Sequence, residues 1–418
     1  MYLRIKFCAL AGLIFSIAPA FAVQGDTPSV EQMWEIIQQQ AKEIEKLKAA
    51  ATQRDQRIQV TDLKVEATAD AVEQRVNDTA HTGERQTSIG GYGELHYNNL
   101  DDESGRERAD DVDEIDLHRY VLFFGHQFTD TVRFYSELEV EHSVAGDGQN
   151  GEVELEQAFI EWDYATNQRA KAGVFLVPVG ILNETHEPDT FYGVERNRVE
   201  AEIIPATWWE GGVAFSGELG AGFSYDFGVH SGLFLDETAR LRSGRQKVSE
   251  AKADEPAYTA RLKYTGVRGL ELAATVQYQT DLSQGETFAG ESSIDAMLYE
   301  VHAAYQSGPF QLRALYALWD IDEGINAVTE RDDADQREGF YIEPAVKITD
   351  QLGLFLRYSE WDEVRADAGA DMSMSERMFG ANFWLTETVV LKADYQDQEG
   401  VAGRAELDGF NLGVGWSF

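Results

Sequence analysis

The charged side chains between Pro178 and Trp208 are the part of this sequence whose composition points most clearly to chemistry. This stretch contains two arginines, Arg196 and Arg198, among six carboxylates. The carboxylates are Glu184, Glu187, Asp189, Glu195, Glu200 and Glu202. Guanidinium and carboxylate groups mixed in this way orient ions and polar solutes through a local field, but they do not fix the sign of the preferred ion. The stretch therefore predicts recognition of polar solutes in water rather than bond-making chemistry.

Motifs for catalysis or for cofactor binding do not occur in the sequence. It contains no nucleophile elbow, no phosphate-binding loop, no dinucleotide fingerprint and no zinc-binding helix motif. The eight histidines are scattered along the chain without ligand spacing, and His186 between Glu184 and Glu187 is more simply explained as loop decoration. We therefore expect no enzyme activity, no cofactor and no metal site.

The charge balance excludes one class of partner. Against 35 lysines and arginines stand 74 aspartates and glutamates, which gives a formal net charge of −39. Nucleic-acid binding needs a basic surface, so nucleic acid is not expected to be a partner. A field of this sign attracts cations instead.

The first 22 residues read as a secretory signal peptide. Two basic residues precede an apolar stretch over 7–17, and a small-x-small cleavage site follows at 20–22. The apolar stretch is shorter than the 20 or so residues that a membrane-spanning helix needs. The single cysteine, Cys8, lies inside this peptide, so the mature chain has no disulfide.

A helical segment follows, within the predicted domain 23–86. Apolar residues recur every seven positions, as in a coiled coil. These positions are Val30, Ile37, Ile44, Ala51, Ile58, Val65 and Val72. A single helix this polar would not be stable alone, so partner helices are implied. The alternative is a mostly solvated linker. In the second half of the segment, this alternative fits the sequence as well as a coiled coil does.

From residue 87 to 418 the pattern changes to strands. One of them places Val132, Phe134, Ser136, Leu138 and Val140 opposite Arg133, Tyr135, Glu137, Glu139 and Glu141. This period-two alternation gives one apolar and one polar face. Seven short turns alternate with eight long loops, which separates sixteen strands. Short turns at one end and longer loops at the other are typical of transmembrane barrels, whereas a soluble β-sandwich would account for the alternation alone.

The last strand carries a further indication. Apolar and aromatic residues alternate with small or polar ones up to Trp416 and the terminal Phe418. A terminal aromatic strand of this kind looks like the signal that outer-membrane proteins present to their assembly machinery. We therefore predict an all-β fold, a 16-stranded antiparallel transmembrane β-barrel with an N-terminal α-helical coiled-coil segment. The barrel would lie in the bacterial outer membrane, in contact with lipid and lipopolysaccharide, and the N-terminal segment in the periplasm.

Residues 116–212 resemble the phosphate-selective porin O and P family. The matching pieces are DLHRYVLFFGHQFTDTVRFYSELEVE, VELEQAFIEWDY, AGVFLVPVGI and TFYGVERNRVE. The resemblance implies a homotrimer of 16-stranded barrels, each narrowed by an inward-folded third loop that carries Glu195 and Arg196. The family's phosphate selectivity depends on a dense lining of arginines and lysines, and the third loop of this chain has two bases.

The predicted function is passive diffusion of small hydrophilic solutes and ions through the barrel. The predicted constriction and lumen residues are Arg196, Arg198, Glu195, Glu200, Glu202, Arg119, Arg133, Glu137, Glu139, Arg169 and Lys171. Two alternatives stay open at this stage. One is a phosphate-selective or other anion-selective channel. The other is a structural barrel that is tethered to the periplasm through its coiled coil.

Overall fold

The computed structural model describes Gln38, Lys42 and residues 87–105, 111–235, 239–287, 290, 293–329, 334–362, 373–400 and 404–418. The chain divides into two compact units, Met1–Glu84 and Arg85–Phe418. The predicted signal peptide and nearly all of the predicted coiled coil lie outside the described residues. The second unit contains the strands described below.

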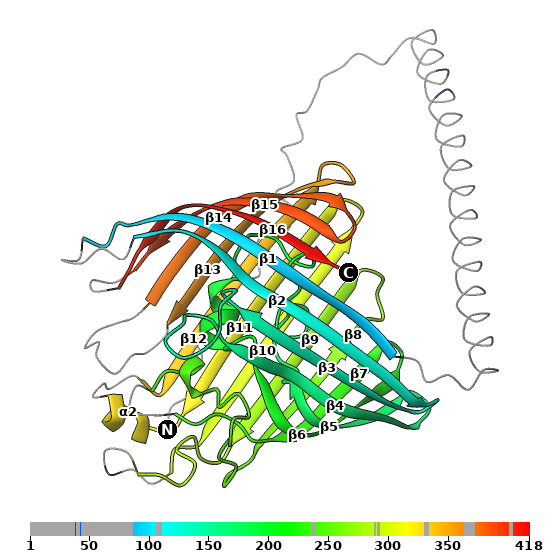
Figure 1. The fold of residues 1–418 in the computed structure, drawn as a ribbon, viewed down its shortest axis with the longest axis vertical. Helices are drawn as coiled ribbons and strands as arrows, with labels where there is room; N and C mark the ends of the chain where they lie inside the picture. The colour runs from blue at the N-terminus through cyan, green and yellow to red at the C-terminus, as the bar shows by residue number, and fades with distance from the viewer. Residues whose placement is uncertain are drawn as a thin grey trace, which may run out of the picture. The chain divides into compact units, whose positions relative to one another are not determined.

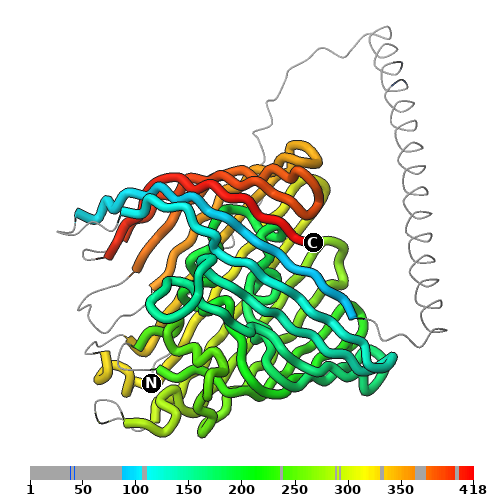
Figure 2. Tube along the Cα trace, in the orientation of Figure 1, coloured from blue at the N-terminus to red at the C-terminus, as the bar shows by residue number. Residues whose placement is uncertain are grey.

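The second unit is a closed barrel of sixteen antiparallel strands (Figures 1 and 2). The strands are β1 Thr87–Asp102, β2 Val112–Thr129, β3 Val132–Glu141, β4 Val153–Ala165, β5 Gln168–Leu176, β6 Trp209–Gly220, β7 Phe223–His230, β8 Ala257–Tyr264, β9 Leu270–Gln279, β10 Ala296–Ser307, β11 Phe310–Ile321, β12 Gln336–Lys347, β13 Leu352–Asp362, β14 Ser373–Thr386, β15 Val389–Glu399 and β16 Leu407–Ser417. Each strand pairs with its neighbours in sequence, and β1 pairs with β16. The predicted 16-stranded antiparallel barrel is confirmed.

Short turns and long loops alternate around the barrel, as predicted. Two residues separate β2 from β3 and two separate β4 from β5, whereas residues 177–208, here called L3, separate β5 from β6. In the β6–β7 turn, Gly222 has a φ of +84°, and a Cβ there would lie 2.3 Å from the Cα of Gly266. A side chain would therefore collide with the neighbouring turn, so this tight packing depends on glycine. The short-turn end also holds both ends of the barrel sequence, because β1 begins there and β16 ends there.

The two faces of the sheet have opposite polarity, with the apolar face outward. In β10, Tyr299 is 44% exposed and Val301 51%, whereas Glu300 is 1% and His302 5% exposed. This inverts the usual arrangement of soluble proteins, in which charged side chains are almost never buried and large apolar ones usually are. No helix among the described residues is long and apolar enough to cross a membrane.

The barrel seam closes through backbone pairing near the C-terminus. The N–H of Phe418 donates to the Gly91 carbonyl at 2.9 Å, and the Gly91 N–H donates to the Phe418 carbonyl at 3.0 Å. The indole of Trp416 packs over Gly93, where a Cβ would lie 2.5 Å from the ring. The two predicted assembly-signal residues therefore lie at the seam, and the phenyl ring of Phe418 is exposed.

Part of the interior is filled by apolar side chains rather than left open. L3 contributes Val199, Ile203 and Trp208 to a buried cluster that also contains residues of the loops after β7, β9 and β11. Trp208 lies 6.2 Å from Trp319 of β11, measured between ring centroids. The short helices α2 (Gly324–Thr329), η1 (Val199–Ile203) and η2 (Arg242–Gly244) belong to these loops. The strand alternation predicts a polar inner face, but it makes no prediction for loop residues, which show no periodicity.

Candidate functional site

L3 is bonded to strands all around the barrel wall. His96 of β1 contacts Glu195 of L3, with 2.8 Å between Nδ1 and Oε1. Three wall side chains donate hydrogen bonds to backbone carbonyls of L3: Trp319 Nε1 to Ile203 (2.8 Å), Arg357 Nη2 to Tyr192 (2.6 Å) and Asn382 Nδ2 to Phe191 (3.0 Å). In the opposite direction, the Val194 N–H of L3 donates to Asp394 Oδ2 at 2.6 Å. The anchoring side chains come from β1, β11, β13, β14 and β15. L3 is thus held against the inward face of several strands by directional bonds, not only by apolar packing.

Glu200 is the most heavily bonded carboxylate of L3. It is fully buried, and it accepts hydrogen bonds from the backbone N–H groups of Ile181 (2.9 Å) and Leu182 (2.5 Å). The Tyr341 hydroxyl of β12 and Asn197 Nδ2 also donate to it, at 2.8 Å and 3.2 Å. Burial raises the pKa of Glu200, although these donors oppose the shift. The structure therefore places this predicted lumen residue inside the loop, where it joins two parts of L3 to each other and, through Tyr341, to the wall.

Glu195 occupies a different environment, within a chain of charged groups. Burial alone would raise the pKa of Glu195, but the facing His96 holds it well below its usual range. His96 also contacts Glu94 at 3.2 Å, and Glu94 forms an ion pair with Arg119 of β2 at 2.7 Å. The structure thus brings the predicted residues Glu195 and Arg119 into one network through His96, which the sequence did not single out, and Glu94, which the strand alternation predicts to face the lumen.

The other predicted residues of L3 lie nearby. Arg196 donates to the Thr207 hydroxyl at 2.6 Å, and its Nε and Nη2 have no hydrogen-bond partner among the described residues. Arg198 contributes to the field that lowers the pKa of Glu195. Glu202 lies 3.9 Å from Arg240 of the loop after β7. The Arg196 guanidinium therefore keeps N–H groups that donate to no described residue.

The wall formed by β3, β4 and β5 carries the remaining predicted residues. Arg133 pairs with Glu161 and Asp163, and Arg169 lies 3.5 Å from Asp163. These groups lie toward the short-turn end of the barrel, away from the Glu195 network. Lys171 lies over the ring of Phe175, with 4.9 Å from Nζ to the ring centroid.

Glu137 and Glu139 are buried on the same wall. Glu137 accepts from Gln157 at 2.6 Å and faces His186 of L3 at 3.2 Å. The two carboxylate oxygens of Glu139 have no hydrogen-bond partner among the described residues, and Arg119 lies 3.9 Å away. Glu139 is therefore a buried carboxyl group without a close base, in contrast to Glu137.

Two arginines on the remaining walls are also paired, whereas Lys392 Nζ has no hydrogen-bond partner among the described residues. Arg357 contacts Glu343 at 2.7 Å, and Arg261 pairs with Glu184 of L3 and with Asp226. Lys392 lies over the ring of Phe191, with 3.6 Å from Nζ to the centroid. Few of the lumen guanidinium and ammonium groups are thus left to replace the hydration shell of an anion.

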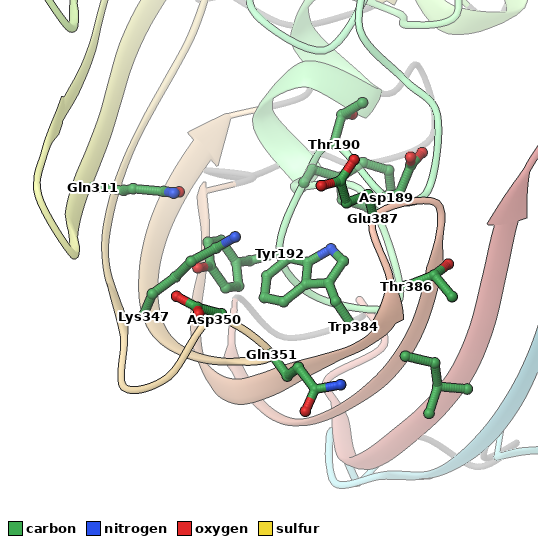
Figure 3. A pocket seen from close by; sticks show the side chains of 12 residues that line it. Asp189, Thr190, Tyr192, Gln311, Lys347, Asp350, Gln351, Trp384, Thr386 and Glu387 are labelled. Carbon is green, nitrogen blue, oxygen red and sulfur yellow. The ribbon is translucent and has the colours of Figure 1, made fainter. Parts of the chain in front are cut away.

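A cavity of about 490 Å³ opens on the short-turn side of L3 (Figure 3). Lys347 and Trp384 line it with their side chains in contact, with 4.4 Å from Nζ to the ring. Tyr192 of L3 packs edge-on against the same indole at 5.6 Å. Asp350 and Gln351, from the turn between β12 and β13, add polar groups. The cavity offers both polar and aromatic surface to a small solute.

Three histidines that look scattered in the sequence meet in the structure. His96 and His118 stack with ring centroids 4.7 Å apart, and His142 lies edge-on to His118 at 5.8 Å. The sets His96–His118–Glu195, Asp116–His118–His142 and Glu137–Glu156–His186 each have donor atoms within 4.8 Å of one another. Sequence spacing missed these groups because the pairing of β1, β2, β3 and β4 and the position of L3 create them. A correct pairing of the three strands would have revealed the histidine row.

Comparison with known proteins gives a relative of similar length. No protein-family model matches the chain. An uncharacterized protein of Aquifex aeolicus (strain VF5) is 30% identical over 359 residues, which cover 79% of this chain and 80% of that protein. The chain belongs to the same family as this protein. The relative carries no described activity, so membership of this family does not by itself define a function.

Solved structures identify the fold. The outer membrane channel DcaP of Acinetobacter baumannii superposes with a TM-score of 0.56 at 13% identity, covering 80% of this chain and 98% of DcaP. OmpF of Salmonella typhi, in complex with daunomycin, gives 0.55 at 13% identity, covering 80% of this chain and 97% of OmpF. At these identities the likeness shows a porin fold and nothing finer. The resemblance to the phosphate-selective porin O and P family stays a prediction.

Proposed function

We propose that this protein is an outer-membrane porin through which small hydrophilic solutes and ions diffuse passively, and that L3 narrows its lumen. The observation that carries the proposal is a closed ring of sixteen strands whose apolar side chains face outward while charged ones face inward. An apolar exterior of this kind is stable in contact with lipid, and a charged interior is stable in contact with water. The contacts of L3 with β1, β11, β13, β14 and β15 support its placement across the lumen.

The pairing of the lumen bases favours cations over anions. Arg119, Arg133, Arg261 and Arg357 are each paired with a carboxylate, whereas Arg196 and Lys392 keep nitrogen atoms without a hydrogen-bond partner among the described residues. The chain as a whole has a net charge of −39. A field of this sign raises the local concentration of cations. Phosphate selectivity is the weaker alternative, because a multivalent anion needs several free bases at one point.

The predicted homotrimer and the periplasmic position of the N-terminal segment complete the proposal. Both the trimer and the periplasmic segment are expected if the protein is a porin. The short-turn end, where β1 begins, would face the periplasm. Native mass measurement in detergent would give the number of subunits.

Swelling of liposomes that contain the purified protein tests the proposed diffusion channel. Liposomes with the protein should swell in isotonic solutions of small sugars, at rates that fall as the sugar becomes larger. The control is liposomes that contain the same protein after heat denaturation. Swelling no faster than this control, for every sugar, would contradict the channel.

A further inference from the structure

The histidine row lies in the lumen where β1, β2 and β3 meet L3. His96 is 3% exposed in its side chain, His118 is 26% and Glu195 is 29%. His96 Nδ1 faces Glu195 Oε1 at 2.8 Å, and the His96 and His118 rings are nearly parallel, with 14° between their planes. Donor atoms of two imidazoles and one carboxylate thus lie close together, and the side chains of His118 and Glu195 are partly exposed.

We propose that His96, His118 and Glu195 bind a divalent transition-metal ion such as Zn²⁺. Two imidazole nitrogens and one carboxylate oxygen are a common set of protein ligands for zinc, and water completes the tetrahedron. Ligand atoms at about 2.05 Å from a tetrahedral ion are about 3.4 Å apart. The three donor atoms already lie within 4.8 Å of one another, and rotation of one imidazole out of the stacked arrangement would direct both rings at one ion.

The carboxylates next to His96 and His118 favour these three ligands over the neighbouring set of donor groups. A metal-bound histidine usually donates its second ring nitrogen to a carboxylate, which orients the ring. Glu94 lies 3.2 Å from His96 Nε2, on the opposite side of the ring from Glu195. Asp116 lies 3.4 Å from His118 Nδ1, which leaves Nε2 for the ion. Both imidazoles therefore have their orienting carboxylate in place.

The neighbouring set of Asp116, His118 and His142 is less suitable. His118 and His142 both turn Nδ1 toward the same Asp116 oxygen, at 3.4 Å and 2.8 Å. With Asp116 used as a ligand, neither ring would keep a second carboxylate contact among the described residues. We therefore place His142 outside the ligand set.

A bound ion would have a consequence for L3. Glu195 belongs to L3, whereas His96 and His118 belong to β1 and β2. The ion would thus join the loop to the wall at the point where the Glu195–His96 contact now does so. This metal site is a function in addition to the proposed diffusion channel. Binding of the metal ion does not require that the barrel conduct solutes.

Titration with Co²⁺ tests the site directly, because tetrahedral Co²⁺ absorbs visible light much more strongly than the hydrated ion. The full-length protein is used without a histidine tag, and Zn²⁺ is then added as a competitor. Wild type should give saturable absorption at one ion per chain that Zn²⁺ removes. His118→Ala and Glu195→Gln should each weaken Co²⁺ binding at least tenfold. Because Glu195 lies in L3, the Glu195→Gln substitution leaves the sequence of the barrel strands unchanged.

Two matched controls keep the test specific. His126→Ala removes a histidine from the other end of β2, where it contacts Thr87, and should leave binding unchanged. His142→Ala should also leave binding within about twofold of wild type. The proposal is overturned if the wild type gives no saturable absorption, if His118→Ala binds like wild type, or if His142→Ala abolishes binding while Glu195→Gln does not. Because the readout is binding alone, a failure of the channel proposal would show separately in the swelling assay.

Discussion

Removing the Glu200 carboxylate should release L3 from the barrel wall. In Glu200→Ala, the N–H of Leu182 and the Tyr341 hydroxyl lose their acceptor while they stay buried, and the half-buried N–H of Ile181 loses it as well. Each unsatisfied buried donor costs about 1–3 kcal/mol, so the two buried donors cost the docked loop about 2–6 kcal/mol. Since 1.4 kcal/mol changes an equilibrium tenfold, even the lower bound raises the ratio of displaced to docked L3 more than about tenfold.

Single-channel recording in planar bilayers measures this release. If L3 narrows the lumen, Glu200→Ala should give a larger mean conductance and more open-channel noise than wild type. Tyr341→Phe is the matched control, because it removes one of the donors and keeps the carboxylate, at a cost of about 1 kcal/mol. Its conductance should lie close to that of wild type. Conductance and noise in Glu200→Ala that equal those of wild type would refute the assignment of Glu200 as an anchor of L3.

Three further predictions follow from the lumen, the seam and the N-terminal segment. Arg196→Ala combined with Arg198→Ala should lower anion permeability, and an unchanged reversal potential in a salt gradient would remove these bases from the conduction pathway. Gly93→Val should reduce the yield of folded barrel, because its Cβ would lie 2.5 Å from the indole that closes the seam, whereas Gly228→Ala, with its nearest atom at 3.7 Å, should fold normally. Folded yield is read from the heat-dependent shift in electrophoretic mobility, and equal yields would contradict the seam argument. Deletion of 29–80 should leave single-channel conductance unchanged, and lost envelope integrity with normal conductance would favour the structural alternative.

The architecture of the barrel could be predicted because it depends on local patterns. Alternation such as that of Val132, Phe134 and Leu138 against Arg133 and Glu137 assigns each residue to a face without knowledge of its neighbours. Two-residue turns and long loops then fix the order of the strands. Strand number, antiparallel pairing and the outward apolar face could all be derived in this way, and the structure confirms them.

The details of the site depend on contacts between residues far apart in the sequence. Glu200 and Glu195 are both acidic loop residues in the sequence, yet one is buried under four donors and the other faces His96. The histidine row needs the register of three strands, in which His118 and His142 become neighbours. A one-residue error in register would turn such side chains to the opposite face, so sequence patterns alone do not predict them.

The reversal potential of the reconstituted channel in a KCl gradient tests the central claim most directly. A wet, polar lumen with paired bases and excess carboxylate should give stepwise current increases whose reversal potential has the sign of K⁺ selectivity. The same sign should persist in wild type when chloride is replaced by a larger anion. Absence of current steps from folded protein would contradict the channel, and a reversal potential of the opposite sign would contradict the proposed charge lining.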